Sequence, residues 1–206
     1  MSRYDLSPLA FPPEAYEPLC SAETMLAHRA AADSCALLLA VATDGYPAAL
    51  GMTPAALCRA ARRFPKPVAE DVRFGAGGVF CHEMYFRYLL PGGTVRLPVG
   101  QAEALLSSSF GSVDGFFYRF RTVARDARTN GFLWLLRRRK GGSAVCLLDW
   151  TEGYRLPDGR LGEPVFCLDL WEHAYVGRFG EDRAAYADTY LKMLDWRAIA
   201  AAMESL

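Results

Sequence analysis

Histidine is scarce in this chain, and one of the histidines shares a short segment with a carboxylate. The sequence contains three histidines, His28, His82 and His173, and Asp169 lies four residues before the last of them. Asp169 falls within an apolar segment, where an unpaired carboxylate would be costly to bury. Imidazole nitrogens together with one carboxylate are a ligand set for iron, manganese or zinc, and each binds in its deprotonated form. A metal ion is therefore a candidate partner for Asp169.

A second interpretation of the same segment needs no metal. A buried Asp169 can accept hydrogen bonds from backbone N–H groups, with His173 as an ordinary core residue. The D-x-x-x-H spacing is common and, taken alone, favours this interpretation. The residues around the pair must decide between the two.

Three helices are expected in the first half of the chain. Ser21 is a suitable N-cap for a long helix that carries His28 and ends before Asp44-Gly45. Thr53-Pro54 begins a second helix, Pro54 to Phe64, closed by Pro65-Lys-Pro67, and the two should form a helical hairpin. A third apolar helix, Gly77 to Leu90, carries His82 and ends before Pro91-Gly92-Gly93.

The second half has mixed periodicity. Helices are expected over Gln101 to Phe110 and Val113 to about Arg128, and near the end over Arg183 to Met193 and Trp196 to Met203. Between these pairs, three apolar segments separated by turn residues predict a small antiparallel sheet: Phe132 to Arg137, Ala144 to Leu148 and Val165 to Leu170. The expected architecture is α+β, with an N-terminal helical domain over residues 1–92 and a mixed domain over residues 93–206.

Composition argues against several classes of partner. Lys plus Arg and Asp plus Glu are each 23, so no net charge favours nucleic acid or anionic lipid. The basic run at residues 137–140 is expected to be solvated surface. The proline-containing N-terminus does not resemble a signal peptide, and the apolar run at 35–42 is too short to cross a bilayer. Six scattered cysteines fit a soluble cytoplasmic protein without disulfides.

Several segments, in order along the chain, resemble one known family. Asp169 and the following L-W-E-H-A-Y are similar to the D-V-W-E-H-A-Y signature of the iron/manganese superoxide dismutases. S-A-E-T-M-L-A-H at 21–28 resembles the segment with the first ligand of that family, and G-G-V-F-C-H at 77–82 falls at its second histidine. G-F-L-W-L at 131–135 resembles its aromatic strand. The resemblance extends over nearly the whole chain.

This resemblance implies a function and a site. His28, His82, Asp169 and His173 would bind one iron or manganese ion per subunit. Such an ion takes an electron from one superoxide and gives it to another, which yields dioxygen and hydrogen peroxide. The resemblance also implies the neighbours of the ion, which are Tyr85, Gly78, Phe132, Trp134 and Trp171.

The sequence departs from the family pattern around this site. Ala36 stands where the family has a gateway tyrosine, Ala32 where it has a histidine, and Val176 where it has a second tyrosine. Its glutamine, which hydrogen-bonds the metal-bound solvent, falls at Gly78 or Thr151. Loss of such a group commonly lowers metal affinity or activity about 10–100-fold, so dismutation could be reduced or altered.

Two further features follow from the resemblance. Glu172 would contact His173 of the other subunit in a symmetric homodimer. Cys35 and Cys81 could approach the space left by the gateway tyrosine, although buried inert thiols are the simpler interpretation.

Three hypotheses therefore stand. The first is an active superoxide dismutase in which the residues around the metal ligands differ from the family pattern. The second is a metalloprotein of the same fold that acts on another small oxidant, as a peroxidase or oxidase does. The third is a structural homologue without catalysis, which is disfavoured because all four ligand positions are kept.

Overall fold

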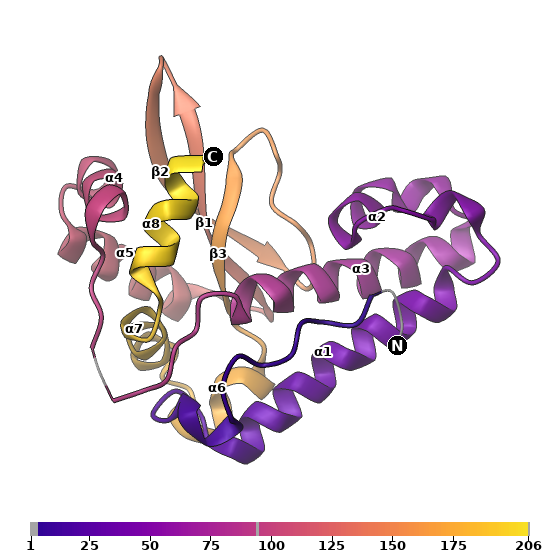
Figure 1. The fold of residues 1–206 in the computed structure, drawn as a ribbon, viewed down its shortest axis with the longest axis horizontal. Helices are drawn as coiled ribbons and strands as arrows, with labels where there is room; N and C mark the ends of the chain where they lie inside the picture. The colour runs from indigo at the N-terminus through magenta and orange to yellow at the C-terminus, as the bar shows by residue number, and fades with distance from the viewer. Residues whose placement is uncertain (1–3, 94, 206) are drawn as a thin grey trace.

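The computed structural model describes residues 4–93 and 95–205 (Figure 1). Its helices are α1 (Ala22–Ala42), α2 (Pro54–Ala60), α3 (Lys66–Phe86), α4 (Gly100–Phe110), α5 (Val113–Asp126), α6 (Glu172–Phe179), α7 (Arg183–Lys192) and α8 (Trp196–Ser205), and its strands are β1 (Gly131–Lys140), β2 (Ser143–Glu152) and β3 (Glu163–Asp169). A helical region precedes a small sheet with flanking helices, which confirms the expected α+β class.

The long helix α1 begins where its capping residue predicts. The Ser21 hydroxyl oxygen accepts a hydrogen bond from the Thr24 N–H at 3.1 Å, which satisfies one of the free donors of the first turn. The partner of α1, however, differs from the expected one. α1 packs along α3, and α2 lies against α3 as a short cover (Figure 1). The hairpin of α1 with residues 54–64 was a wrong prediction.

The two prolines at the start of α3 explain why the predicted pairing of helices was wrong. Pro65-Lys-Pro67 was expected to end the second helix, yet Pro65 is the N-cap and Pro67 lies in the first turn of α3. Proline is tolerated there because the first N–H groups of a helix have no acceptor within it. The helix therefore begins 11 residues before the expected Gly77 and ends at Phe86 instead of Leu90.

Residues 89 and 90, expected in this helix, instead join the two halves of the molecule. Leu89 forms an isolated antiparallel bridge with Leu194, and the Leu90 N–H donates to the Met193 carbonyl. Because these backbone groups are satisfied from the C-terminal part, the chain leaves the helix here.

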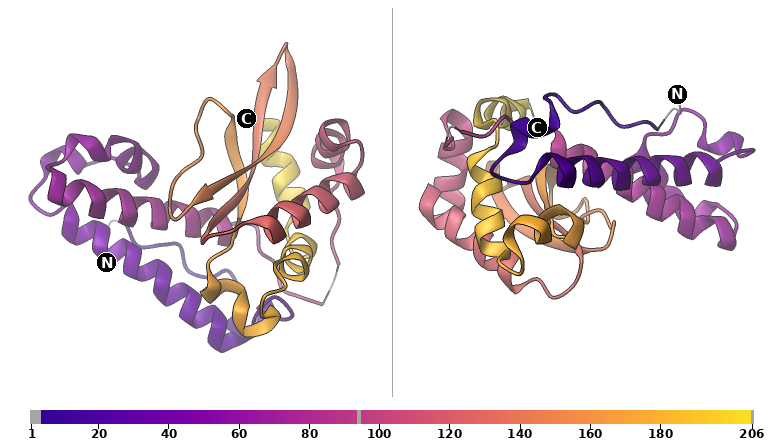
Figure 2. Two further views of the ribbon diagram at one scale, coloured as in Figure 1. Left: turned by 180° about the vertical axis from the view of Figure 1, so that it is seen from behind. Right: turned by 90° about the horizontal axis from the view of Figure 1, so that it is seen from below.

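The three strands form an antiparallel sheet in the order β2-β1-β3. β1 and β2 extend beyond their expected segments, whereas β3 begins two residues before the expected Val165 and ends at Asp169, one residue before the expected Leu170. The long β1–β2 hairpin projects from the body of the molecule (Figure 2). In the register of β1 with β3, Phe132 faces Asp169. The central strand is apolar and fully buried from Phe132 to Leu136, so it forms the centre of the core.

The helix that carries His173, α6, was not predicted from the sequence. Its N-cap is Trp171, which makes no side-chain cap, so the usual start signal is missing. α6 follows β3 after two residues and packs against α1.

One helix, α1, is long and apolar enough to cross a membrane by length and composition. α1 has 21 residues, whereas the expectation that no segment spans a bilayer considered only the eight-residue apolar run at 35–42. Core helices pass the same test, and α1 packs on α3 and contributes Met25, Ala32 and Leu39 to the core.

Candidate metal centre

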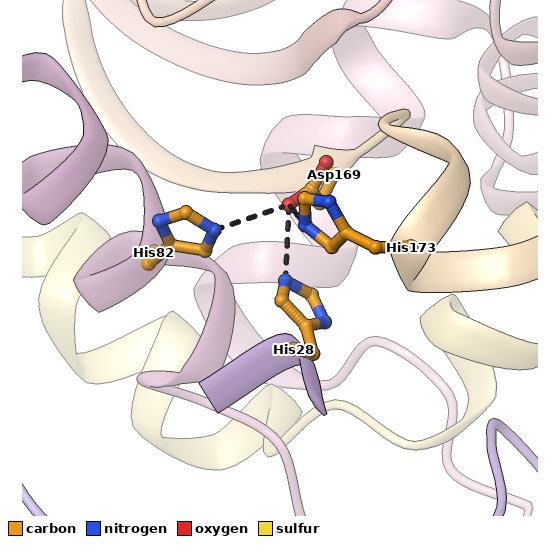
Figure 3. Close-up of side chains that lie close together, drawn as sticks. All are labelled: His28, His82, Asp169 and His173. Atoms are coloured by element: carbon orange, nitrogen blue, oxygen red, sulfur yellow. Dashed lines mark hydrogen bonds and ion pairs between the residues drawn. The ribbon is translucent and has the colours of Figure 1, made fainter. Parts of the chain in front are cut away.

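Four polar side chains from four elements meet in the interior of the molecule (Figure 3). His28 comes from α1, His82 from α3, Asp169 from the end of β3 and His173 from the first turn of α6. His28, His82 and Asp169 are buried, whereas the His173 side chain is 27% exposed. The site therefore faces solvent on the His173 side.

The spacing within this cluster suits a single ion. The Nε2 atoms of His28, His173 and His82 lie 3.0, 3.4 and 3.6 Å from Oδ2 of Asp169. Ligands about 2.1 Å from one ion lie roughly 3.0–3.6 Å apart at angles of about 90–120°. One ligand atom from each residue lies within 4.8 Å of those of the other three. The residues present therefore fit a metal ion.

Hydrogen bonds outside the cluster orient two of the four groups. His82 Nδ1 lies 2.8 Å from the carbonyl oxygen of Gly78, to which it donates, so its Nε2 carries a lone pair that faces the Asp169 carboxylate, which has no proton to donate. Oδ1 of Asp169 accepts from the Trp171 N–H at 2.7 Å, which directs Oδ2 toward the imidazoles. Among the described residues, the buried Nε2 atoms of His82 and His173 have no hydrogen-bond partner. A metal ion is a partner that would satisfy both.

The protonation states also suit a cation. Burial lowers the pKa of His82 to about 4 and also lowers that of His28, although Asp169 opposes both shifts. Burial alone would raise the pKa of Asp169, but polar contacts with His173 and His28 outweigh it and hold that pKa below its usual value. Near neutral pH the site thus presents an anionic carboxylate beside two neutral imidazoles, the forms that bind metal.

The low pKa of His82 makes the stability of the metal-free protein depend on pH. Between about pH 6.5 and 4 the unfolded chain binds a proton at this residue and the folded chain does not. We therefore expect the free energy of unfolding to fall as pH decreases through this window, by up to about 3 kcal/mol. Urea unfolding of metal-depleted protein at several pH values measures it. The His82→Gln variant should show a shallower slope, and equal slopes would contradict a neutral His82.

Aromatic rings surround the cluster. Tyr85 and Phe86 lie with ring centroids 4.8 and 5.0 Å from that of His28. Phe132 meets the His82 ring edge to face at 6.0 Å. These rings keep water from the buried side, which strengthens electrostatic interactions within the site.

The two tryptophans expected to enclose the ion lie at different depths. Trp171 stacks beside His173 with ring centroids 6.1 Å apart. Trp134 packs on Phe132 and Phe80, and its Nε1–H donates to Oγ1 of Thr151 at 2.8 Å. Phe132 therefore lies between Trp134 and the His82 ring, and the Thr151 hydroxyl is the hydrogen-bond partner of Trp134.

The structure adds Tyr154, which the sequence analysis overlooked. Its ring stacks on Trp171 at 4.9 Å and lies 5.5 Å from the His82 ring, and its side chain lies close to the Cys35 thiol. Tyr154 directly follows Gly153, which has a positive φ of 59° just after β2, in a stretch interpreted only as turn. An aromatic residue next to a strand end was the available signal.

Cys35 and Tyr154 occupy the space beside Gly78, one of the two positions that the resemblance assigns to glutamine. A Cβ atom on Gly78 would lie 2.4 Å from Sγ of Cys35 and 3.6 Å from Cδ2 of Tyr154. Real Cβ atoms essentially never approach another atom that closely. No larger residue fits at Gly78 unless its neighbours move.

The remaining altered positions are closed or peripheral. Ala32 and Ala36 are buried in the core, and Val176 is 45% exposed on α6. Cys81 is buried beside Cys167, whose thiol donates to its carbonyl, and burial raises the pKa of the Cys81 thiol well above its usual value. Burial likewise raises the pKa of Cys35 to about 11, so both are protonated thiols at neutral pH. All six cysteines are free.

Comparison with known proteins identifies the family. Residues 98–202 match the C-terminal domain of the iron/manganese superoxide dismutases. The chain is also 28% identical over 194 residues to manganese superoxide dismutases of Thermus thermophilus and Listeria monocytogenes. These alignments cover 94% of this chain and 93% and 94% of the two relatives. The chain belongs to the iron/manganese superoxide dismutase family.

Proposed function

We propose that this protein is a superoxide dismutase with His28, His82, Asp169 and His173 as the ligands of one iron or manganese ion per subunit. The observation that carries the proposal is the convergence of these side chains, with the Nε2 atoms of His82 and His173 unpartnered. When bound, the ion would supply the redox chemistry, accepting an electron from one superoxide and returning it to the next.

The protein residues hold and shield such an ion. The Gly78 carbonyl fixes the tautomer of His82, and the Trp171 N–H fixes the carboxylate of Asp169. The Tyr154 ring covers the site beside His82 and Trp171. A small anion would enter on the partly exposed side at His173.

The direct test is metal analysis of the purified protein combined with an assay of superoxide removal. We expect about one iron or manganese ion per subunit and activity that His173→Ala abolishes, since the variant lacks one imidazole ligand. The matched control His173→Gln keeps the bulk of the side chain but should lose activity as well. Stoichiometric metal without superoxide removal would overturn the proposal and indicate another small oxidant, as for a peroxidase or oxidase.

A homodimer is part of the proposal. Glu172 is exposed in the first turn of α6, and within the described residues its carboxylate makes no hydrogen bond or ion pair. It is thus available to contact His173 of a second subunit, as the family resemblance implies. Light scattering of the same purified sample tests this. We also propose a cytoplasmic location, which the six free cysteines support because thiols stay reduced there.

The division into domains 1–92 and 93–206 also stays a proposal. Each part would supply two of the four ligands, His28 and His82 from the first and Asp169 and His173 from the second. Neither part expressed alone should therefore retain the metal, whereas the two parts mixed together should.

A further inference from the structure

A cationic hollow lies at the other end of the sheet from the metal centre. It has a volume of about 370 Å³ and forms where the end of β1 passes the loop that enters β3. Its lining includes four arginines, Arg137, Arg138, Arg139 and Arg160, and one carboxylate, Glu163. The basic run of β1 was expected to be solvated surface, and for Arg137 that prediction was wrong.

Arg137 is buried, with 7% of its surface exposed. Within the described part of the chain, its Nε atom has no hydrogen-bond partner, and neither has the buried Nε of Arg138. A buried N–H donor without a partner is costly, because it has lost its hydrogen bond to water. The Nε–H groups of both arginines are therefore available to donate to an anion.

The charges of the hollow are also unbalanced. Among the described residues, no guanidinium nitrogen of these four arginines lies within 4 Å of a carboxylate oxygen, although the backbone N–H of Arg160 donates to Oδ1 of Asp158 at 2.9 Å. The arginines elsewhere that do form ion pairs are Arg29, Arg121, Arg125 and Arg178. Four arginines against two carboxylates, Glu163 in the lining and Asp158 beside Arg160, leave a surplus of positive charge that attracts anions.

The backbone around the hollow is closely fitted. The register of β1 with β3 pairs Arg137 with Glu163, and the strand continues beyond its partner. The loop before β3 lies against β1 so tightly that a Cβ atom on Gly162 would be 2.7 Å from the Arg137 carbonyl oxygen. The guanidinium groups are thus carried by a strand and a loop held against it, which favours a preformed site.

We propose that this hollow binds a phosphate group, either as free phosphate or as part of a small phosphate-bearing molecule. Planar guanidinium groups donate paired hydrogen bonds to phosphate oxygens, and several arginines together are typical of phosphate recognition. The volume is within the range of small-molecule sites.

This site is separate from the metal centre. Phe132 pairs with Asp169 in the sheet, and Arg137 lies five residues further along β1. At about 3.4 Å per residue, the backbone of Arg137 lies roughly 17 Å from that position. Binding here is independent of the proposed dismutase chemistry.

Calorimetric titration of the purified protein with inorganic phosphate and, separately, with ADP tests the proposal, with chloride keeping the ionic strength constant. We expect saturable binding that Arg160→Gln and Arg137→Gln each weaken at least about tenfold, because each removes charge-assisted hydrogen bonds. The control is Arg62→Gln, an exposed arginine in the N-terminal region, which should bind as the unaltered protein does.

The outcomes separate the possibilities. Equal affinity for phosphate and ADP would indicate free phosphate, and tighter binding of ADP would indicate a phosphate-bearing metabolite; either supports the site. Arg160→Gln lies in an exposed loop and keeps the test valid should Arg137→Gln not fold. Absence of saturable binding would overturn the proposal, and so would affinities that are the same in Arg160→Gln and Arg62→Gln, since phosphate would then bind elsewhere, for example at the metal.

Discussion

Asp169→Asn is expected to abolish metal retention and superoxide removal while leaving the fold intact. The amide keeps the shape of the side chain and can still accept the hydrogen bond from the Trp171 N–H. It loses the negative charge that faces the three imidazoles at 3.0, 3.4 and 3.6 Å. Because Asp169 is the anionic member of the cluster, we expect metal affinity to fall at least about 100-fold. Metal content after dialysis and superoxide removal measure the change.

The matched control for this substitution is Asp149→Asn, a partly buried carboxylate on β2, the strand at the opposite edge of the same sheet. It should retain metal and activity. Unfolding of the metal-free proteins adds a second readout. Because contacts with the imidazoles hold the pKa of Asp169 below its usual value, its charge stabilises the metal-free fold, and metal-free Asp169→Asn should be less stable than the unaltered protein near neutral pH. A metal content equal to that of Asp149→Asn would show that Asp169 is not a ligand.

The sequence was informative about the residues of the cluster and less so about the elements that carry them. His28 and His82 are far apart in sequence, and neither hydrophobic periodicity nor spacing could show that they meet. The resemblance to a family supplied that expectation. The helix α6 was overlooked because Trp171 provides no capping oxygen, although His173 depends on that helix for its position.

Packing partners were the weakest part of the sequence analysis. Local signals gave the start of α1 at Ser21 and the strands of the sheet, since caps and alternation are properties of short segments. They did not show that α1 packs on α3, because Pro65 and Pro67 fit the end of one helix and the start of the next equally well. The hollow at Arg137 likewise depends on the loop before β3, whose lining residues lie more than 20 residues further along the chain.

The packing around Gly78 likewise could not be predicted from the sequence. The sequence showed glycine where the family can have glutamine, but not what fills the space. In the structure Cys35 from α1 and Tyr154 from the segment after β2 close on Gly78 from two directions. Three residues from distant parts of the chain thus depend on one another, and changing one of them alone should be unfavourable.

Gly78→Ala is expected to destabilise the protein, although alanine is the better helix former. The added Cβ would lie 2.4 Å from Sγ and 2.8 Å from Cβ of Cys35, so α1 or the thiol must shift. Overpacking of this kind costs about 1–3 kcal/mol. Alanine in place of glycine gains about 1 kcal/mol in helix propensity, and the overpacking cost outweighs this gain where the contact cannot relax. Both contacts are with a buried residue of a packed helix, so we expect a net loss. Gly78→Gln should be worse. Denaturant unfolding measures both variants.

A double-mutant cycle with Cys35→Ala locates the cause. This substitution removes the sulfur at 2.4 Å and leaves the Cβ contact at 2.8 Å, so Gly78→Ala should destabilise the Cys35→Ala background by at least about 1 kcal/mol less. Gly177→Ala is the control, since a Cβ at this helical glycine of α6 would meet only Oγ1 of Thr24, at 3.3 Å. Strict additivity of Gly78→Ala and Cys35→Ala would mean that the thiol does not limit the space at Gly78. Coupling would show that the Cys35 sulfur and a side chain at position 78 compete for the same volume. Cys35 would then be the residue that excludes glutamine from this side of the site.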